Sequence, residues 1–305
     1  MGGRIYSPMP ELSICLVTLN TRHYLRDCLQ SLAENPASLP TEIIVVDNGS
    51  SDGTQAMLTG EFPHVVVILN SKNEGFVRPA NQAMRSAKGR YLLLLNPDTL
   101  VLPEALDRLV AFLDEHPAAG IAGPKVLNRD GSLQQACRRG VPRPWATLSY
   151  FLRLYRLFPR SPFFGGYLLN YLDEDETYPV DGVSGSCMLI RREVAEQIGY
   201  LDERFFAYQE DSDFCFQAKR LGWQVYYHPA ARIIHYGGQG GSRYQPYRSI
   251  FEWHRSYYLF YRKNLAKDYF FLFNWIYYAV MTLKLGMSLL HNLLRKEKHP
   301  GPRRG

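Results

Sequence analysis

The sequence has few cysteines, no apolar N-terminal segment and no long uninterrupted hydrophobic run. Its 305 residues include five cysteines and no Cys-x-x-Cys spacing, which disfavours a disulfide framework or a zinc site. A mean hydropathy of −0.25 excludes a protein made mostly of membrane spans. Residues 1–7 contain no signal-peptide core, and we therefore expect a cytoplasmic protein.

Positive charge is concentrated in two segments of the chain. The net charge is +6, yet residues 138–160 contain six arginines and no acid, and residues 295–305 carry five basic residues and one acid. The sequence shows no zinc-finger spacing, RNP-like motif or basic heptad pattern. This distribution favours a local partner surface and argues against nucleic acid as the partner.

Short apolar runs alternate with helical patterns in the first hundred residues. Such alternation indicates βαβ units and a mainly parallel sheet with helices on both faces. The expected fold is therefore α/β and Rossmann-like. We predict strands over Leu12–Leu19, Glu42–Asp47, Val65–Leu69 and Arg90–Leu95, and helices over Tyr24–Ala33, Thr54–Thr59 and Val77–Ala87.

The pattern is less regular after residue 103. Small and aromatic residues replace the simple alternation, and the arginine-rich stretch falls in this part. We predict a helix reaching Asp114, a strand near Ile121, a hairpin near residues 128–131, a helix followed by an exposed loop over Trp145–Leu172, a strand pair within Val180–Ile190, a helix over Glu210–Leu221 and a last strand over Ala231–His235.

Polar residues at the carboxyl ends of the predicted strands indicate a nucleotide site. Thr18, Asn20, Asp47 and Asp98 fall at or just past such ends, where ligands of parallel sheets bind. We expect Asp47 to accept hydrogen bonds from a base or ribose, and Asp98 to bind Mg²⁺ or Mn²⁺ together with substrate phosphates. An ordinary Asn-Pro-Asp turn is the alternative for Asp98. His235, at the end of the last predicted strand, is a candidate metal ligand or phosphate contact, with a structural histidine as the alternative.

Two further segments place charged groups at predicted helix starts. Residues 73–81 open a helix whose N-terminal amides attract phosphate, and Arg78 adds charge there. Glu210, Asp211 and Asp213 begin another helix, where close carboxylates raise at least one pKa and suit a general base. Complementarity to the helix dipole is the simpler alternative. We favour Asp211 as the base and Glu210 as an acceptor contact, and leave Asp213 unassigned.

The C-terminal segment is strongly apolar. Residues 269–283 are almost entirely apolar, Lys284 interrupts the run, and residues 285–294 continue it more weakly. A spanning helix needs about 20 apolar residues. We therefore expect a helix that lies in the membrane interface, with its aromatic residues buried and its lysines, Lys284 among them, near anionic headgroups, followed by the basic tail. A core helix or a homodimer helix is the alternative.

In their order and spacing, these motifs closely resemble family 2 glycosyltransferases with the GT-A fold. The resemblance is strongest to rhamnosyltransferase-type members that build bacterial cell-surface polysaccharides. The matching segments are Thr18-Leu-Asn20, Val46–Thr54, Asn73–Phe76, Asn81, Leu95–Asp98, Gly185 with Arg191-Arg192, Gly199–Glu203 with Phe206, Glu210–Asp213 and His235.

The resemblance implies a domain organisation and a set of site residues. A GT-A domain would span residues 1–245, with a nucleotide-sugar half near 12–100 and an acceptor half near 101–245, before a helical membrane-associating segment at 246–305. Asn96 departs from the family pattern, which often has aspartate there. The implied residues are Asp211 as the catalytic base, Asp98 and His235 as metal ligands, and Thr18, Asn20, Asp47, Asn73, Gly75, Arg78, Asn81, Asn96, Gly185 and Glu210 as substrate contacts.

The expected activity is the inverting transfer of a sugar from a nucleoside-diphosphate donor, assisted by Mg²⁺ or Mn²⁺. Rhamnose is the sugar that the resemblance suggests, and the acceptor would be a glycan or a polyprenyl-diphosphate-linked glycan at the cytoplasmic membrane face. A sugar nucleotidyltransferase is one alternative, although Leu12–Arg22 lacks a triphosphate-binding loop. A catalytically inactive membrane-peripheral scaffold is the other, and the presence of Asp47, Asp98 and Asp211 argues against it.

Overall fold

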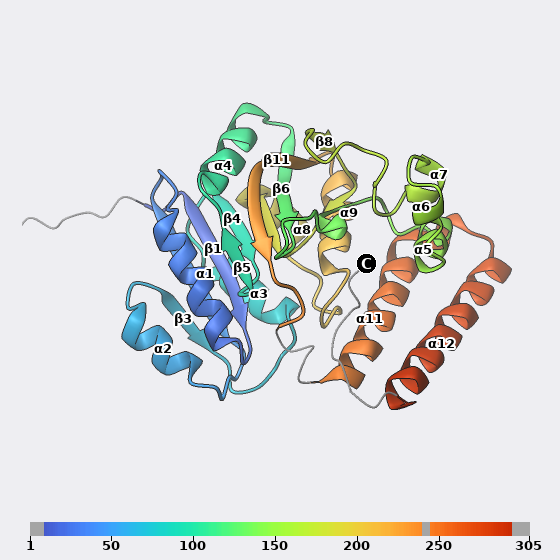
Figure 1. Cartoon of the computed structure of the whole chain (residues 1–305), viewed down its shortest axis with the longest axis horizontal. Coiled ribbons are helices and arrows are strands. Elements are labelled where there is room, and N and C mark those ends of the chain that lie inside the picture. Colours follow the sequence, from blue (N-terminus) through green and yellow to red (C-terminus); the bar gives the residue numbers. More distant parts are fainter. Residues whose placement is uncertain (1–8, 240–244, 295–305) are drawn as a thin grey trace, which may run out of the picture.

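A nine-stranded sheet forms the centre of the molecule (Figure 1). The computed structural model describes residues 9–239 and 245–294. In spatial order the strands are β3 (Val66–Leu69), β2 (Thr41–Asp47), β1 (Leu12–Thr18), β4 (Tyr91–Leu95), β10 (Cys187–Arg191), β6 (Ala119–Leu127), β11 (Gln224–His235) and β5 (Thr99–Val101). Strand β8 (Tyr178–Pro179) pairs with β11 beside this path.

The first four strands along the chain are parallel, as the sequence predicts. Strand β1 lies between β2 and β4, and β2 also pairs with β3. All five residues of β4 are buried, as expected for a parallel strand covered on both faces. The register sets Thr18 opposite Asp47 and Leu16 opposite Leu95. The carboxyl ends of β1, β2 and β4 therefore meet at one edge of the sheet.

Beyond β4 the sheet is mixed. Strand β10 runs antiparallel to both β4 and β6, whereas β11 is parallel to β6 and antiparallel to β5. The predicted strand pair within Val180–Ile190 is wrong, because its two halves enter different sheets. Strand β9 (Gly182–Val183) pairs with β7 (Arg138–Arg139) in a separate two-stranded sheet, and only β10 joins the main sheet.

Helices pack on the sheet between successive strands (Figure 1). In α3, the residues that repeat at helical spacing, Val77, Ala80, Ala83 and Met84, are buried. This apolar stripe packs against the sheet and fixes the position of the helix start. The helices around the sheet are α1 (Arg22–Glu34), α2 (Thr54–Glu61), α3 (Val77–Ser86), α4 (Ala105–Glu115), α8 (Arg192–Ile198) and α9 (Glu210–Arg220), with a short 3₁₀ turn η1 (Gln135–Cys137).

Most of the arginine-rich stretch and the residues just after it fold into three short helices, α5 (Pro144–Phe151), α6 (Leu154–Leu157) and α7 (Pro162–Gly165). We expected one helix and an exposed loop over Trp145–Leu172, and the loop half of that prediction is wrong. The segment closes on a small buried cluster of Tyr155, Tyr167 and Leu168. Aromatic side chains in this stretch thus provide a local core that periodicity alone did not indicate.

Two longer helices, α11 (Pro246–Phe260) and α12 (Phe271–Leu294), complete the described chain. A π-helical turn, η2 (Tyr261–Leu265), and a 3₁₀ turn, η3 (Ala266–Asp268), connect them. The two helices pack side by side at one end of the molecule (Figure 1). Within residues 9–239 and 245–294, no helix combines the length and apolar character needed to cross a bilayer. The predicted basic tail lies outside the described residues.

Helix α11 and the turn after it pack against the sheet domain. Ser256 Oγ donates to Ala207 O (2.8 Å), which lies just before α9. Lys263 Nζ lies 2.7 Å from Asp213 Oδ2, so this third acidic residue of α9 has a structural partner. The domain division at residue 245 remains a prediction, and these contacts join the two sides of it.

Candidate active site

Hydrogen bonds join the loops that follow β1 and β2. The backbone N–H of Asn20 donates to Ser50 Oγ (2.9 Å), and the N–H of Ser51 donates to Asn20 Oδ1 (2.8 Å). The buried hydroxyl of Thr18 lies 2.8 Å from the hydroxyl of Thr21. Thr18 and Asn20 therefore shape the strand-end edge at which we predict the donor nucleotide.

Asp47 ends β2 with one carboxylate oxygen already in use and one available. The side chain is fully buried, and Oδ1 accepts a hydrogen bond from the N–H of Ser50 (3.1 Å). Oδ2 has no hydrogen-bond partner among the described residues. A buried carboxylate oxygen without a donor is costly, so this atom is suited to accept hydrogen bonds from a ligand.

Asn48 holds residues 73–75 in place, a role that sequence reasoning missed. We call these residues the donor loop, because contacts to the sugar-nucleotide donor are predicted there. Its amide nitrogen donates to Asn73 Oδ1 (3.1 Å) and to Gly75 O (2.7 Å). Its amide oxygen accepts from the N–H of Glu74 (3.1 Å). The signal available in the sequence was its position directly after Asp47, at the end of a buried strand. Asn73 and Gly75, two predicted substrate contacts, are fixed by this amide.

Gly75 sits where the donor loop touches the segment before α9. Its φ is +90°, in the left-handed region, and a Cβ there would lie 2.5 Å from Phe206 O. The N–H of Phe76 donates to the same carbonyl (2.7 Å). A side chain at position 75 is therefore excluded both by the backbone conformation and by space.

Asn81 and Arg78 lie on α3 and contact the segment that precedes α9. The buried amide of Asn81 donates to Leu201 O (2.9 Å) and accepts from Leu201 N–H (3.0 Å). The Arg78 side chain is 58% exposed and lies 3.5 Å from Glu74 and 3.6 Å from Glu203. Asn81 thus braces α3, and substrate binding by either residue stays a prediction.

Asp98 and His235 lie together, as predicted for a metal pair. His235 Nε2 is 3.2 Å from Asp98 Oδ1 and 3.3 Å from Asn96 Nδ2. Its other ring nitrogen, Nδ1, lies 2.8 Å from Gln134 Oε1. Burial alone would raise the pKa of Asp98, but hydrogen bonds from His235 and the backbone of Gln239 outweigh burial and lower the pKa below its usual value.

This pair fits a divalent cation. A cation bound at Nε2 would replace any proton on that nitrogen, and Gln134 Oε1, which only accepts hydrogen bonds, would then hold the proton of Nδ1 and orient the ring. A separation of 3.2 Å suits two ligands of one cation that binds each at about 2.0–2.1 Å. The described chain contains no cluster of three or more His, Cys, Asp or Glu side chains at metal-binding distance. The other ligands would then come from water and substrate phosphates, which Mg²⁺ favours.

The carboxylate of Asp211 is held by several donors. Oδ2 accepts from the N–H of Gly185 (2.9 Å) and forms a buried ion pair with Nη2 of Arg139, while Oδ1 accepts from the N–H of Ser212 (2.7 Å). Arg139 also donates to Val183 O (3.1 Å). Burial would lower the pKa of Arg139, but the charge of Asp211 raises it. The negative charge of Asp211 is therefore fixed in position at the start of α9.

Glu210, the residue before Asp211, lacks the hydrogen-bond donors that surround Asp211. Its side chain is buried, and Oε2 has no hydrogen-bond partner among the described residues. Burial and then the charge of Asp211 raise the pKa of Glu210 to about 8. At neutral pH the protonated form of Glu210 is therefore favoured, while the ion pair with Arg139 is made by Asp211. The two carboxyl groups differ because Arg139 pairs with Asp211 and not with Glu210. The sequence predicted a raised pKa in this cluster but did not show which residue would have it.

Residues 184–186 connect the metal pair with the acidic pair. Ser186 O accepts a hydrogen bond from the N–H of Asn96 (2.9 Å), and Gly185 N–H donates to Asp211. The loop that carries Asp98 and the start of α9 are thus linked through one turn. The structure brings the predicted metal, base and acceptor residues to the same strand-end region.

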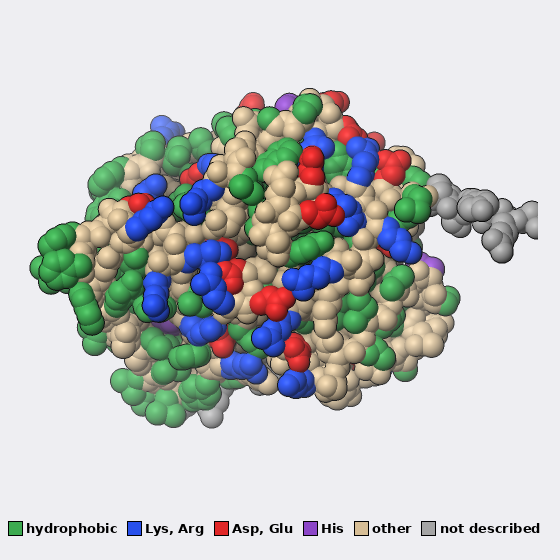
Figure 2. All heavy atoms as spheres, turned by 180° about the vertical axis from the view of Figure 1, so that it is seen from behind, with side chains coloured by type: hydrophobic (Ala, Val, Ile, Leu, Met, Phe, Trp, Pro, Cys, Tyr) green, Lys and Arg blue, Asp and Glu red, His purple; other side chains and the backbone are tan. Residues whose placement is uncertain are grey.

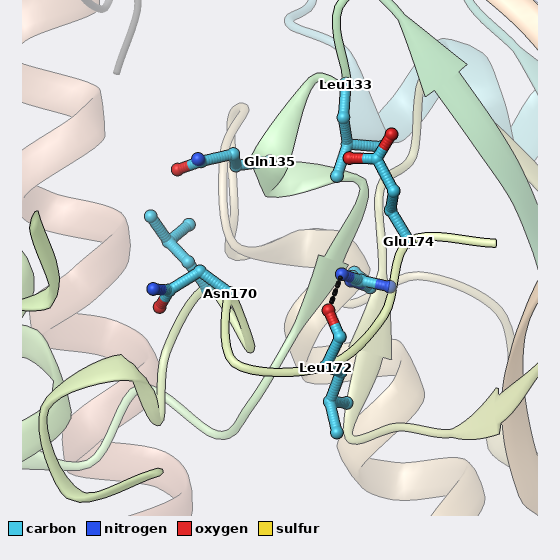
Figure 3. A pocket seen from close by; sticks show the side chains of 7 residues that line it. Leu133, Gln135, Asn170, Leu172 and Glu174 are labelled. Carbon is cyan, nitrogen blue, oxygen red and sulfur yellow. Dashed lines mark hydrogen bonds between the residues drawn. The ribbon is translucent and has the colours of Figure 1, made fainter. Parts of the chain in front are cut away.

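A small cavity lies beside Arg138, the neighbour of Arg139 (Figure 3). Its volume is about 110 Å³, well below the roughly 300–1,000 Å³ of ligand pockets. Arg138 Nη2 donates to Leu172 O (2.8 Å), and the guanidinium stacks on the Tyr227 ring. Arg138 therefore has a structural role, and none of the predicted site residues lines this cavity.

The polar strand ends, the Asp98–His235 pair and the Glu210–Asp211 pair thus lie where the sequence analysis predicts a sugar-nucleotide site. Residues 13–199 match the sequence profile of the family described as Glycosyl transferase family 2. This chain therefore belongs to glycosyl transferase family 2, and the protein is a glycosyltransferase.

Two relatives of the chain are named as glycosyltransferases. The chain is 29% identical over 266 residues to the N-acetylglucosaminyl-diphospho-decaprenol L-rhamnosyltransferase of Mycobacterium tuberculosis, covering 84% of this chain and 81% of that protein. It is also 29% identical over 216 residues to the low-salt glycan biosynthesis hexosyltransferase Agl10 of Haloferax volcanii, covering 70% and 62%. The resemblance to rhamnosyltransferase-type members is confirmed.

Solved structures share the fold at low sequence identity. TarS 1–349 of S. aureus, in complex with UDP, superposes with a TM-score of 0.54 at 19% identity, covering 82% of this chain and 65% of that chain. The mannosyltransferase PcManGT of Pyrobaculum calidifontis, in complex with GDP-Man and Mn²⁺, gives 0.56 at 17% identity, covering 84% and 64%. These similarities confirm the expected GT-A fold, and α11 and α12 form the expected C-terminal helical extension.

Proposed function

We propose that this glycosyltransferase moves a sugar, with rhamnose as the first candidate, from a nucleoside-diphosphate donor to a hydroxyl of a lipid-linked glycan. The observation that carries the proposal is the placement of three groups around one edge of the sheet: the unpartnered oxygen of Asp47, the Asp98–His235 pair and the fixed carboxylate of Asp211. The mycobacterial relative, whose name specifies a polyprenyl-diphosphate-linked acceptor, supports the acceptor class.

The donor would bind along the carboxyl ends of β1, β2 and β4. Asp47 Oδ2 would accept hydrogen bonds from the nucleoside, while the loop held by Asn48 would line the sugar-diphosphate. Asp98 and His235 would hold Mg²⁺ or Mn²⁺ together with the diphosphate. Such a cation supplies charge neutralisation for the departing diphosphate.

The transfer would be a single displacement. The acceptor hydroxyl oxygen forms a bond to the anomeric carbon as the bond between that carbon and the diphosphate oxygen breaks, and the electron pair leaves with the nucleoside diphosphate. The proton of the hydroxyl passes to Asp211, whose carboxylate is oriented by Arg139 and Gly185. Attack from the side opposite the leaving group inverts the anomeric centre. Glu210, protonated at neutral pH, would donate a hydrogen bond to the acceptor.

Donor binding can be tested by thermal shift against a panel of nucleoside diphosphates and their sugars, with and without Mn²⁺. We expect stabilisation that is selective for one base and stronger with the metal, because ligand binding to the folded state raises its stability. Asp98→Ala should lose the metal enhancement and keep a weak metal-independent shift. No shift with any nucleotide at millimolar concentration would contradict the donor site and favour an inactive scaffold of the same fold.

A further inference from the structure

Helix α12 has an inverted distribution of polar and apolar residues. Two of its polar side chains point toward α11: Lys284 Nζ lies 3.1 Å from His254 Nε2, and Ser288 Oγ lies 3.4 Å from the same nitrogen. Asn274 accepts a hydrogen bond from the hydroxyl of Tyr261. Burial lowers the pKa of Lys284 to about 8, in agreement with its inward position. We had expected this lysine to face headgroups, and that expectation is wrong.

The outward face of α12 is apolar and carries no charged residue. Lys284 is the only Asp, Glu, Lys or Arg in the helix, and it points inward. Soluble helices normally place their polar residues outward and their apolar residues against the protein. The exposed large side chains are Phe271, Leu272, Phe273, Trp275, Ile276, Val280, Leu283, Met287, Leu290, Leu293 and Leu294, with exposed fractions from 38% to 74%.

Helices α5–α7 extend this apolar surface. The Phe151 ring of α5 packs on Trp253 of α11 (centroids 5.6 Å apart) and lies under Lys284 Nζ (4.3 Å), so α5 lies directly against the α11–α12 pair. Figure 2 shows hydrophobic side chains gathered at the edge of the molecule where α12 lies, with Lys and Arg side chains beside them. The exposed large apolar residues of this stretch are Trp145, Leu148, Leu152, Leu157, Phe158 and Phe163.

Four exposed arginines lie among these apolar residues without acidic partners. Arg143, Arg153, Arg156 and Arg160 are exposed, and none of them forms a salt bridge within the part of the chain that the structure describes. Some exposed arginines elsewhere do have carboxylate partners, as Arg90 has in Asp114 and Glu11. Unneutralised arginines beside exposed aromatic and leucine side chains match an anionic membrane surface in charge and polarity.

We propose that α12 and α5–α7 form one bilayer-binding surface, in which the apolar side chains enter the headgroup–acyl boundary and the four arginines contact anionic lipid phosphates. Membrane binding by this surface does not depend on the proposed function. Only its purpose rests on that function, because the surface would bring the active site to a lipid-linked acceptor. A second copy of the chain is the competing occupant of the apolar face, and the cluster of arginines without carboxylate partners favours anionic lipid instead. The lack of any spanning helix among the described residues agrees with a peripheral position.

Vesicle flotation of the full purified chain tests this surface. We expect binding to vesicles of phosphatidylcholine with phosphatidylglycerol, and much weaker binding to phosphatidylcholine alone. Ile276→Glu with Val280→Glu should reduce binding at least tenfold, because both outward positions would then bring charge into the boundary. The matched control is Val66→Glu, an exposed apolar position on edge strand β3, which should bind as the wild type does.

Charge reduction on α5–α7 provides a second test at exposed positions. Arg153→Gln with Arg160→Gln should weaken binding to anionic vesicles about fivefold for each arginine. Lys88→Gln with Arg108→Gln, both exposed and on other elements, is the control and should leave binding unchanged. Unaltered binding in both surface variants, or no vesicle binding by the wild type, would overturn the proposal. A wild-type dimer that Ile276→Glu and Val280→Glu convert to a monomer, without vesicle binding, would assign the face to a second copy.

Activity separates failure of this surface from failure of the proposed function. The surface variants should retain wild-type transfer to a water-soluble short-chain acceptor and lose transfer to a vesicle-embedded one. If the wild type binds vesicles and transfers to neither acceptor, the proposed activity is wrong and the surface stands. If it transfers to both without binding vesicles, the activity stands and the surface is wrong.

Discussion

Replacing Glu210 by glutamine should stabilise the protein more as the pH rises. Glu210 is buried beside the charge of Asp211, and its pKa rises from 4.5 to about 8. The folded state therefore binds more protons than the unfolded state between these two values. Its stability contribution is fully present below about pH 4.5 and is lost as the pH rises through about 8. Glutamine resembles the protonated carboxyl and never has to lose a proton.

The size of the effect follows from the pKa difference. Each pKa unit corresponds to about 1.4 kcal/mol, so the full rise amounts to a few kcal/mol. We expect the gap in unfolding free energy between Glu210→Gln and the wild type to widen in favour of the variant between about pH 5 and about pH 8, by up to roughly 1.4 kcal/mol per pH unit.

Urea unfolding of both proteins across this range measures the gap. Subtracting the two curves removes the pH dependence of the groups that do not interact with position 210. Glu115→Gln, at an exposed position, is the matched control and should show no comparable trend. A gap for Glu210→Gln that stays constant with pH would refute the assignment of the proton to Glu210 and, with it, the division of roles within the acidic pair.

Three further substitutions test other parts of the site. Gln134→Leu removes the hydrogen-bond acceptor that orients His235 through Nδ1. The Mn²⁺ concentration that half-saturates the nucleotide-induced thermal shift should therefore rise about 10–100-fold. An unchanged Mn²⁺ titration would reject this role of Gln134. Gly75→Ala sets a methyl group 2.5 Å from Phe206 O at a φ of +90°, and should lower the urea-derived stability by about 1–3 kcal/mol, whereas equal stability would contradict the close approach. Asp211→Asn should lower the transfer rate by at least about 100-fold with donor affinity near normal, and full activity would reject Asp211 as the base.

The parallel half of the sheet could be predicted because its signal is local. Four short apolar runs separated by helical patterns leave few arrangements, and Thr18 and Asp47 fall at strand ends by their position in the sequence alone. Asp98 follows for the same reason, since it comes directly after the buried run that forms β4. Local periodicity was enough for this part because each strand and helix is defined by consecutive residues.

The partners of the site residues could not be predicted, because they come from distant parts of the chain. Arg139 lies 72 residues before Asp211, and Gln134 lies 101 residues before His235. No local pattern distinguishes these two side chains from their neighbours Arg138 and Gln135. Only the pairing of β7 with β9 and the path of β11 bring them to the site.

The orientation of α12 was also beyond sequence reasoning. A lysine in an apolar helix normally marks the solvent or headgroup side, and we assigned Lys284 accordingly. The structure turns it toward His254 and between the rings of Phe151 and Trp253. Which face of an apolar helix meets the protein depends on the neighbouring helices, which periodicity does not specify.

Transfer from a nucleoside-diphosphate rhamnose to an N-acetylglucosaminyl-diphospho-polyprenol, followed by NMR of the new linkage, tests the central claim most directly. We expect a product in the presence of Mn²⁺ whose anomeric configuration is opposite to that of the donor, and no product with Asp211→Asn. A product with retained configuration would contradict the single displacement. Wild-type transfer by the Asp211→Asn variant would contradict the role of the fixed carboxylate.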